Sequence, residues 1–519
     1  MKKKLAGLLV YFAVLVTLIG AWGGLASAQS PKRELRGAWI ATVKNIDWPS
    51  RGGLTVEVQQ EELLTLLDTL ENYGINAIFL QIRPSGEVFY PSRTEPWSQW
   101  LTGEQGRAPQ PYYDPLAFAI EAAHARNMEF HAWINPFRAD LDWTPDKVLA
   151  TNHVGRLHPG WCVAYGRNLY LDPGWPEVRR YVIDQVLDVA RRYEVDAIHF
   201  DDYFYPYQIA GQEFPDSLSF GTWGSPMAER GDWRRDNINQ FIHGLRDSLL
   251  ALDPSIQFGI SPFGVWRNEA DDPRGSPTRA GQTSYDALYA DVRLWLERGW
   301  IDYIVPQLYF SIGYAPAAFD RLLDWWTENT YGRRLYIGHS PYKVGQNSDR
   351  NWDQPEQLPL QVRLTRQHPE VLGSAWFSAR WFALNPLGFA DSLRQNYYRQ
   401  PALIPPLDYL GQTAPPRPVD LGSRSQAQGV EVQWKLNRTG STAYYAIYRK
   451  KGTKAPSLEA KYLYALVSAE EVGLFIDEQT RFLRRYSYRI TALNRAHLES
   501  EGSLPVVQRR WSGLFQRER

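Results

Sequence analysis

Residues 60–83 read QEELLTLLDTLENYGINAIFLQIR, and this stretch contains the repeating unit of the fold. In its first half leucines recur every three or four positions, as on the buried face of a helix, until Tyr73 and Gly74 end the pattern. The second half, Ala77–Arg83, is a short and mainly apolar run of the kind that forms a buried strand. The stretch therefore predicts a helix followed directly by a strand.

Seven further runs look like this strand, and helical stretches such as Pro115–Arg126 and Pro176–Tyr193 lie between them. Strands that alternate with helices in this way favour a closed parallel (β/α)8 TIM barrel. An open doubly wound sheet is the alternative, but no glycine-rich phosphate turn follows the first strand. The predicted strands are Leu35–Thr42, Ala77–Arg83, Glu129–Asn135, Ala197–Tyr203, Gln257–Phe263, Tyr303–Phe310, Leu335–Ser340 and Gly373–Ser378.

The barrel interpretation also predicts which side chains point inward. Alternate residues of a barrel strand face the axis and the helix layer, and the apolar set suits the helix layer. Polar residues therefore gather toward the carboxyl ends of the strands, where barrel enzymes place their active sites. The inward set of the second, third, fourth and sixth strands is Phe79, Gln81, Arg83, His131, Trp133, Asn135, His199, Asp201, Gln307 and Tyr309.

The sharpest chemical signal is the sequence HFDDYFYP at residues 199–206. Two adjacent acids after an apolar strand are costly to bury unless they pair with a cation or take part in the chemistry of a site. Glycosidic cleavage needs one carboxylic acid to protonate the leaving oxygen and one carboxylate to attack the sugar or activate water. Asp201 points inward and is the first candidate for the carboxylate, while Asp202 could orient Arg83, bind a hydroxyl or be the partner. The alternative is a structural role, in which the acids pair with Arg83 or Arg138.

A partner acid is harder to identify. Glu87 and Glu95 lie in the long loop after the second strand, where aromatic and small residues could shield a carboxyl and raise its pKa. Asp47 after the first strand and Glu269 after the fifth are further candidates. The sequence leaves this choice open.

The composition excludes some functions. Lys+Arg and Asp+Glu are both 57, so the chain lacks the basic excess that a nucleic-acid binder needs. The 21 tryptophans and 30 tyrosines suit sugar rings, whose apolar faces stack on aromatic side chains. Cys162 is the single cysteine, so no disulfide forms within the chain.

Two other chemistries are disfavoured. His131, His199 and Asp201 could converge on zinc or manganese, but no His-x-x-x-His or Cys-x-x-Cys spacing supports a site. The segment Gly338-His339-Ser340-Pro341 lacks the Gly-x-Ser-x-Gly pattern of a serine nucleophile. We expect neither a metal nor another cofactor.

The amino terminus has the pattern of a secretory signal peptide over residues 1–28. Lys2–Lys4 precede an apolar run from Leu5 to about Ala21, and Ala26-Ser27-Ala28 supplies a cleavage site before Gln29. We therefore expect Sec-type export to the bacterial periplasm or medium, with no stable membrane span after cleavage. A retained membrane anchor is the alternative, and no cysteine near the cleavage site would carry a lipid.

Five motifs in this order resemble the glycosyl hydrolase-like 10 family, also called the YngK-type or DUF187 barrels. The resemblance covers roughly residues 33–400 and implies a (β/α)8 glycosidase fold. It also implies a cell-envelope glycan as substrate, because a member hydrolyses peptidoglycan strands that lack peptide stems. Members often have aspartate where this chain has Glu87. The motifs are Glu34–Ile40, Gln81–Gly86, Glu95–Ser98, His131–Pro136 and His199–Pro206.

The remaining chain differs in composition. Prolines mark residues 401–418 as a linker, and strand-like runs at residues 419–509 follow it. Trp434 in an early strand and Tyr486 or Tyr488 in a late one resemble a fibronectin type III domain with its tyrosine corner. This small all-β sandwich is expected to be a spacer or docking module, with carbohydrate binding as the alternative.

The sequence thus predicts an exported glycoside hydrolase with paired carboxylates and a polysaccharide or peptidoglycan substrate. A glycan-binding or scaffold protein without catalysis is the alternative. The candidate catalytic residues are Asp201, Asp202, Glu87 and Glu95, and the candidate substrate contacts are Gln81, Arg83, Trp97, His131, Asn135, Arg138, His199, Tyr203, Gln307, Tyr309 and Trp376.

Overall fold

The computed structural model describes residues 30–224, 229–435, 442–469 and 473–511. The predicted signal peptide lies outside these ranges. Within them, no helix has the length and apolar character needed to cross a membrane.

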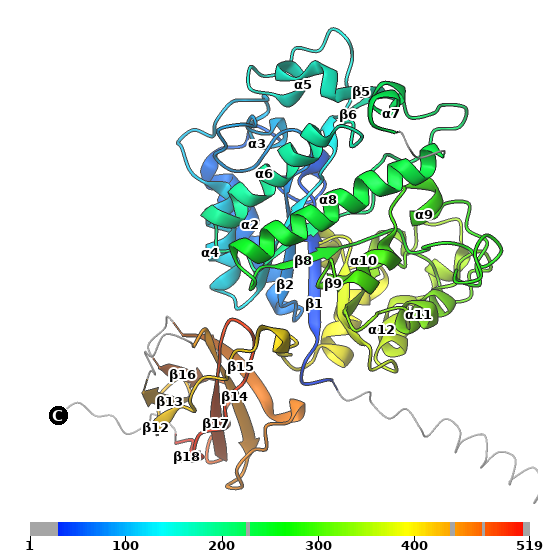
Figure 1. Cartoon of the computed structure of the whole chain (residues 1–519). Helices are drawn as coiled ribbons and strands as arrows, with labels where there is room; N and C mark the ends of the chain where they lie inside the picture. Colours follow the sequence, from blue (N-terminus) through cyan, green and yellow to red (C-terminus); the bar gives the residue numbers. More distant parts are fainter. Residues whose placement is uncertain (1–29, 225–228, 436–441, 470–472, 512–519) are drawn as a thin grey trace, which may run out of the picture.

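The first part of the chain is a closed barrel of eight parallel strands, as predicted (Figure 1). The last strand pairs with the first, with Leu35 opposite Gly373, and this contact closes the barrel. In chain order the strands are β1 (Leu35–Ile40), β2 (Ala77–Arg83), β3 (Glu129–Ile134), β7 (Ala197–Phe200), β8 (Gln257–Ile260), β9 (Tyr303–Ile304), β10 (Arg334–His339) and β11 (Val371–Trp376).

Helices cover the outside of the barrel (Figure 1). The helix expected from the leucine pattern is α2 (Val56–Asn72), which begins earlier than the pattern alone suggests because the Thr55 side chain caps it by accepting a hydrogen bond from the Val58 N–H. Leu63, Leu67 and Leu70 of this helix are fully buried against the strands. The other long helices are α4 (Pro115–His124), α6 (Pro176–Arg192), α8 (Arg230–Leu252), α10 (Val292–Arg298), α11 (Phe319–Glu328) and α12 (Gln357–Thr365).

The sixth barrel strand is shorter than the predicted Tyr303–Phe310. Regular pairing ends after Ile304, because Pro306 has no backbone N–H to donate to a neighbouring strand. The chain then makes single bridges at Gln307, which pairs with Phe263 on one side and Gly338 on the other. Residue 307 therefore still lies at the carboxyl end of the barrel.

Insertions after the third and fourth strands build a wall above that end. β4 (Arg138–Asp140), β5 (Cys162–Tyr165) and β6 (Asn168–Leu171) form a small antiparallel sheet in the order β4-β6-β5. Together with α5 (Val154–Leu157) and α7 (Ser217–Trp223) it lies at the top of Figure 1. The opposite end of the barrel is left for the second domain.

The second domain is all-β, as predicted, and consists of two antiparallel sheets. One contains β12 (Val419–Ser425), β13 (Val430–Lys435) and β16 (Leu474–Asp477), and the other contains β15 (Leu463–Ser468), β14 (Tyr444–Lys451), β17 (Arg485–Leu493) and β18 (Val506–Arg509). Trp434, Ile447 and Ile490 pack between the sheets. The Tyr486 hydroxyl accepts a hydrogen bond from the Arg481 N–H at 2.9 Å, the type of contact that a tyrosine corner makes. The fibronectin type III assignment itself stays a prediction.

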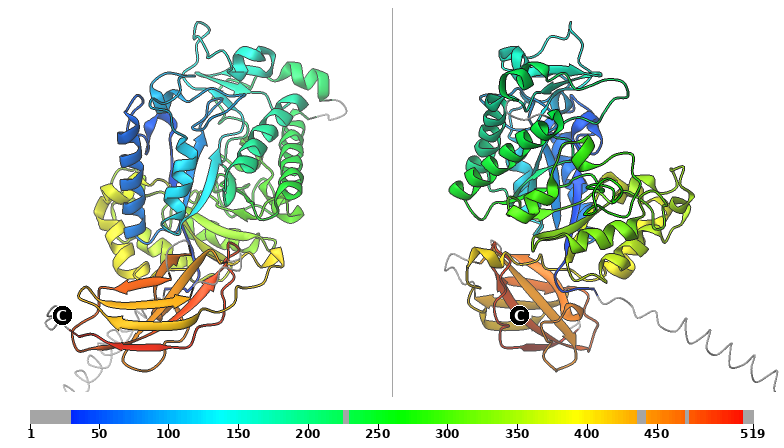
Figure 2. Two further views of the ribbon diagram at one scale, coloured as in Figure 1. Left: turned by 90° about the vertical axis from the view of Figure 1, so that its left-hand side faces the viewer. Right: turned by 45° about the vertical axis from the view of Figure 1, so that its right-hand side comes forward.

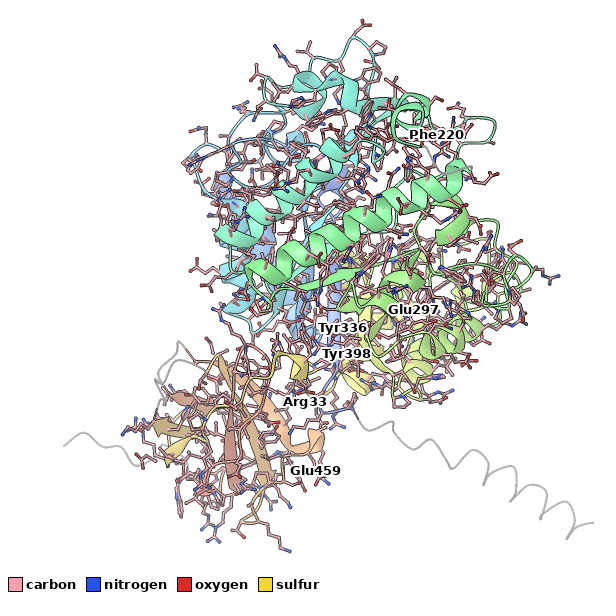
Figure 3. All side chains as sticks on the ribbon, viewed as in Figure 1. Arg33, Phe220, Glu297, Tyr336, Tyr398 and Glu459 are labelled. Carbon is pink, nitrogen blue, oxygen red and sulfur yellow. The ribbon has the colours of Figure 1, made fainter. Side chains whose placement is uncertain are left out.

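The sandwich lies beneath the barrel, against the amino-terminal ends of the strands, in both views of Figure 2. The segment predicted as a linker is packed here, since Leu403 is buried and its N–H donates to the Lys32 carbonyl at 2.9 Å. Arg33, labelled in Figure 3, donates to the carbonyls of Ile404 at 2.8 Å and His497 at 3.0 Å. Backbone and side chains of both domains thus meet at one junction.

A buried carboxylate lies at the centre of this junction. Glu129 is the first residue of β3, and its two oxygens accept hydrogen bonds from His497 Nε2 at 2.7 Å and His131 Nε2 at 3.0 Å. Burial alone would raise the pKa of Glu129, but the charge and hydrogen bond of His497, together with His131, hold that pKa below its ordinary value. The Gln257 amide is a third, longer donor to this carboxylate, at 3.4 Å. The second domain therefore supplies the shortest of the three hydrogen bonds to a charge inside the barrel.

We expect His497→Leu to lower the free energy of unfolding by about 3 kcal/mol, because a buried carboxylate loses its shortest hydrogen bond and keeps only His131 and the more distant Gln257 amide. Since the pKa of Glu129 is lower in the folded chain, this stabilisation is complete above pH about 4.3 and is lost as the pH falls further. Urea unfolding at pH 7 and at pH 3 measures the free energies of unfolding of wild type and His497→Leu. The difference between the two proteins should be smaller at pH 3. His243→Leu, at an exposed histidine, is the matched control. Equal effects of the two substitutions at pH 7 would contradict the assignment.

Candidate active site

A pocket of about 360 Å³ opens at the carboxyl end of the barrel. Its walls are mainly aromatic, and Phe377 lies at their centre, with ring centroids 6.2 Å from Tyr309, 6.3 Å from Trp39 and 6.4 Å from Trp133. Such rings offer flat apolar faces to a sugar. The polar and charged residues that line the pocket, apart from its tyrosines and tryptophans, are Asp201, Asp202, Ser261, Gln307 and Lys343.

Asp201 follows the end of β7 directly and is only 4% exposed. Its carboxyl accepts hydrogen bonds from Asn135 Nδ2 at 3.0 Å and from Trp133 Nε1 at 3.1 Å. The amide of Asn135 is held in this orientation because its oxygen accepts from the Arg138 N–H at 2.9 Å. Burial raises the pKa of Asp201 to about 7, against the opposing charge of Arg138 and with a further rise from Asp202.

Asp202 is buried beside it and lines the same pocket. The Tyr207 hydroxyl donates a hydrogen bond to its carboxyl, and the Gln307 amide is a second donor that favours the charged form. Burial raises the pKa of Asp202 to about 6. The pocket therefore contains two carboxyls that change protonation near neutral pH, as acid–base chemistry requires.

The structure places the two loop acids away from this pocket. Glu87 is buried within its own loop, where it accepts from Ser98 Oγ at 2.7 Å and Gln105 Nε2 at 3.0 Å, and burial raises its pKa. Glu95 is fully buried with Arg83, whose Nε donates to it at 2.8 Å. Two of the predicted site residues thus form an ion pair that braces the loop, and neither loop acid lines the pocket.

The predicted substrate contacts separate into three groups. Tyr203, Gln307 and Tyr309 line the pocket, and Asn135 and Arg138 support it from behind, the latter with its guanidinium 4.7 Å from the centre of the Tyr203 ring. His131 and His199 are fully buried in the barrel core below. The third group, which contacts other elements, is Gln81 bonded to the backbone of Thr42 and Val43, Arg83 paired with Glu95, Trp97 against Tyr112, and Trp376 stacked on His339.

The two core histidines belong to a chain of hydrogen bonds whose direction can be assigned. Trp39 Nε1 donates to His199 Nε2 at 3.2 Å, because an indole can only donate. Burial lowers the pKa of His199 well below its ordinary value, so the ring is neutral, and because Nε2 accepts from Trp39 the proton is on Nδ1. This Nδ1–H donates to the Tyr303 hydroxyl at 3.0 Å.

The chain continues downward to the domain junction. The Tyr303 hydroxyl donates to His131 Nδ1 at 2.7 Å, and His131 Nε2 donates to Glu129. Glu129 is the carboxylate that also binds His497 of the second domain. One series of side chains therefore connects the floor of the pocket, at Trp39, with the second domain.

Sequence reasoning missed several residues of this arrangement, among them Tyr303, Trp39, Lys343 and Tyr207. Tyr303 shares the inward parity of Gln307 and Tyr309 and could have been found by extending that count backward along the same strand. Trp39 could have been found in the same way, by applying the inward and outward alternation to the first strand. Lys343 and Tyr207 lie in irregular segments, where no periodicity shows which way a side chain points. Within the described residues, no group of three or more acidic, histidine or cysteine side chains is suited to hold a metal.

The chain is similar to a known protein family and to named proteins of two bacteria. The sequence model of the family described as glycosyl hydrolase-like 10 matches residues 34–354. Glycosyl hydrolase YngK of Bacillus subtilis (strain 168) is 46% identical over 486 residues, which cover 92% of this chain and 94% of that protein. Glycosyl hydrolase DigH of Escherichia coli (strain K12) is 38% identical over 375 residues, which cover 68% of this chain and 84% of that protein.

We expect Tyr303→Phe to lower the free energy of unfolding by about 1–3 kcal/mol, because the buried Nδ1 atoms of His199 and His131 both lose their partner. Tyr336→Phe removes a hydroxyl from an adjacent core ring, 5.6 Å away between centroids, and is the matched control. Urea unfolding followed by tryptophan fluorescence measures both. A loss no greater than that of the control would contradict the hydrogen-bond chain.

Proposed function

The chain belongs to the glycosyl hydrolase-like 10 family, and on this premise we propose that it hydrolyses peptidoglycan glycan strands with Asp201 and Asp202 as its carboxyl pair. The observation that carries the proposal is the pocket itself, where two buried carboxyls with raised pKa values face aromatic walls. A glycosidase needs one carboxyl that holds a proton and one that is charged at the working pH.

The pKa values support a division of roles between the two acids. Between pH 6 and 7 the pair retains about one proton, because burial raises the pKa of Asp201 to about 7 and that of Asp202 to about 6, and the charge of Asp202 contributes to the rise at Asp201. We assign Asp201 as the proton donor to the leaving oxygen and Asp202 as the carboxylate that attacks the sugar or activates water. This reverses the order that strand parity suggested, because parity shows direction and says nothing about protonation.

The choice of peptidoglycan as the substrate follows from the family and from the predicted export. The family resemblance implies a cell-envelope glycan, and the predicted signal peptide at residues 1–28 would bring the enzyme to such a substrate in the periplasm or outside the cell. Both relatives are named glycosyl hydrolases. The aromatic pocket walls suit a sugar chain of any kind.

The first test is product release from peptide-free peptidoglycan strands by wild type, Asp201→Asn and Asp202→Asn. We expect each substitution to lower kcat/KM by about 10²–10⁴, the usual contribution of a positioned acid or base. On an aryl glycoside whose leaving group needs no proton, Asp201→Asn should lose much less activity, whereas Asp202→Asn should remain impaired. Circular dichroism checks folding, and Glu87→Gln, outside the pocket, is the control. Strand binding by wild type with no product would favour a glycan-binding protein instead.

The second test is the pH profile of kcat/KM. We expect a narrow bell between about pH 6 and pH 7: activity falls below it as the second carboxyl gains a proton, and above it as the shared proton is lost. Trp133→Phe removes a donor to the charged form of Asp201, so its pKa rises further and the upper limb should move to higher pH. Trp97→Phe, away from the pocket, should leave both limbs in place. A profile that is flat from pH 5 to 8 would contradict the carboxyl pair.

A further inference from the structure

The charged groups that line the pocket come from opposite parts of the barrel. Asp201 and Asp202 follow β7, whereas Lys343 ends the short 3-10 turn Pro341–Lys343 after β10, and β10 is three strands from β7 around the barrel. Lys343 is the single cation among the lining residues of the described chain. A ligand in the pocket therefore meets acids on one side and an ammonium group on another.

The Lys343 ammonium is held in place by a backbone carbonyl and two aromatic rings, with no counter-ion among the residues that the structure describes. Its Nζ donates to the Tyr309 carbonyl at 2.6 Å and lies 5.7 Å and 5.8 Å from the ring centres of Phe310 and Tyr342. An ammonium has three N–H donors, so two are left over from this bond. In the part of the chain that the structure describes, Lys343 forms no ion pair within 4.0 Å, unlike Lys147 with Asp140 or Lys44 with Asp142.

The acidic side chain that acts on Lys343, Asp349, forms no ion pair with its ammonium within 4.0 Å in the described residues. Asp349 favours the charged form of Lys343 from a distance, while burial lowers the pKa of Lys343. The Asp349 carboxylate accepts instead from Ser311 Oγ and from the Asn351 N–H at 3.1 Å. A half-buried ammonium with spare donors and no carboxylate partner is a suitable site for an anionic group of a ligand.

We propose that Lys343 binds a carboxylate of the glycan and thereby makes the pocket selective for an acidic sugar. This rests on the proposed function and deepens it. In peptidoglycan the carboxylate is that of the lactyl ether on muramic acid, which is free only where no peptide stem is attached. An amide-linked stem removes its negative charge and one oxygen acceptor.

The same contact orients the sugar. A ligand carboxylate near Asp201 and Asp202 would be repelled by the charge of that pair and would find an attractive partner at Lys343. The acidic substituent therefore points toward β10, and the bond to be cleaved points toward β7. Lys343 acts as a specificity-determining residue, at a distance from the reacting carboxyls.

The test is a cycle that changes both the enzyme and the substrate. Peptide-free strands with free lactyl carboxylates are compared with the same strands coupled to methylamine, using wild type, Lys343→Met and Lys343→Arg. We expect amidation to lower kcat/KM of wild type by about 10- to 100-fold, as for a hydrogen bond between charged groups. Lys343→Met should lower kcat/KM on the free acid by a similar factor and should cleave free and amidated strands at equal rates. Lys343→Arg should keep part of the preference for the free acid. Lys44→Met, at a lysine paired with Asp142, should behave like wild type.

Several results would overturn the inference. If Lys343→Met slows both substrates by one factor, the lysine acts by holding the Tyr309 backbone and recognises no carboxylate. Equal rates of wild type on both substrates would also overturn it while leaving the proposed hydrolysis intact. If wild type cleaves neither, the proposed function fails, and calorimetry with N-acetylmuramic acid and its lactyl methylamide decides the inference separately. Tighter binding of the acid by wild type alone supports it, and equal affinities overturn it.

Discussion

A single buried carboxylate at the bottom of the barrel orders the side chains above it. Glu129 accepts hydrogen bonds at one end of this series and the Trp39 indole donates at the other, so the side chains between them connect a donor to an acceptor. His199, Tyr303 and His131 fill the barrel axis in this fixed order, and each buried nitrogen has a partner. Because His497 of the second domain donates the shortest hydrogen bond to Glu129, the sandwich completes the core of the barrel.

Burial in the pocket above has two opposite consequences. Aromatic walls remove water from Asp201 and Asp202 and raise their pKa values into the neutral range, where a proton can be given and taken back. The same walls surround Lys343 and lower its pKa, and in the described part of the chain its ammonium forms no ion pair. One low-dielectric cavity thus accounts both for the proposed chemistry and for the proposed preference for an acidic sugar.

The insertion loops show how a plausible site residue can turn out to be structural. Arg83 and Glu95 have the residue types of a sugar site and lie near the carboxyl end of β2, yet they are fully buried against each other. Glu87 is likewise satisfied within its own loop. A pairing of this kind depends on the path of a loop through space, which residue spacing in the sequence does not encode.

The barrel, the all-β second domain and the inward direction of Asp201, Gln307 and Tyr309 could all be predicted from the amino-acid pattern, because periods of 3.6 and 2 residues are local properties of helices and strands. Only the tertiary structure decided which polar side chains meet. It kept Glu87 and Glu95 out of the pocket that Asp201 and Asp202 line, and it brought Lys343, from the segment after β10, into that pocket. It also placed His131 and His199 in the core below. These outcomes depend on burial and on contacts between segments that are distant in the sequence. Burial determines the protonation of a side chain and the contacts determine its partners, and neither exists before the chain has folded.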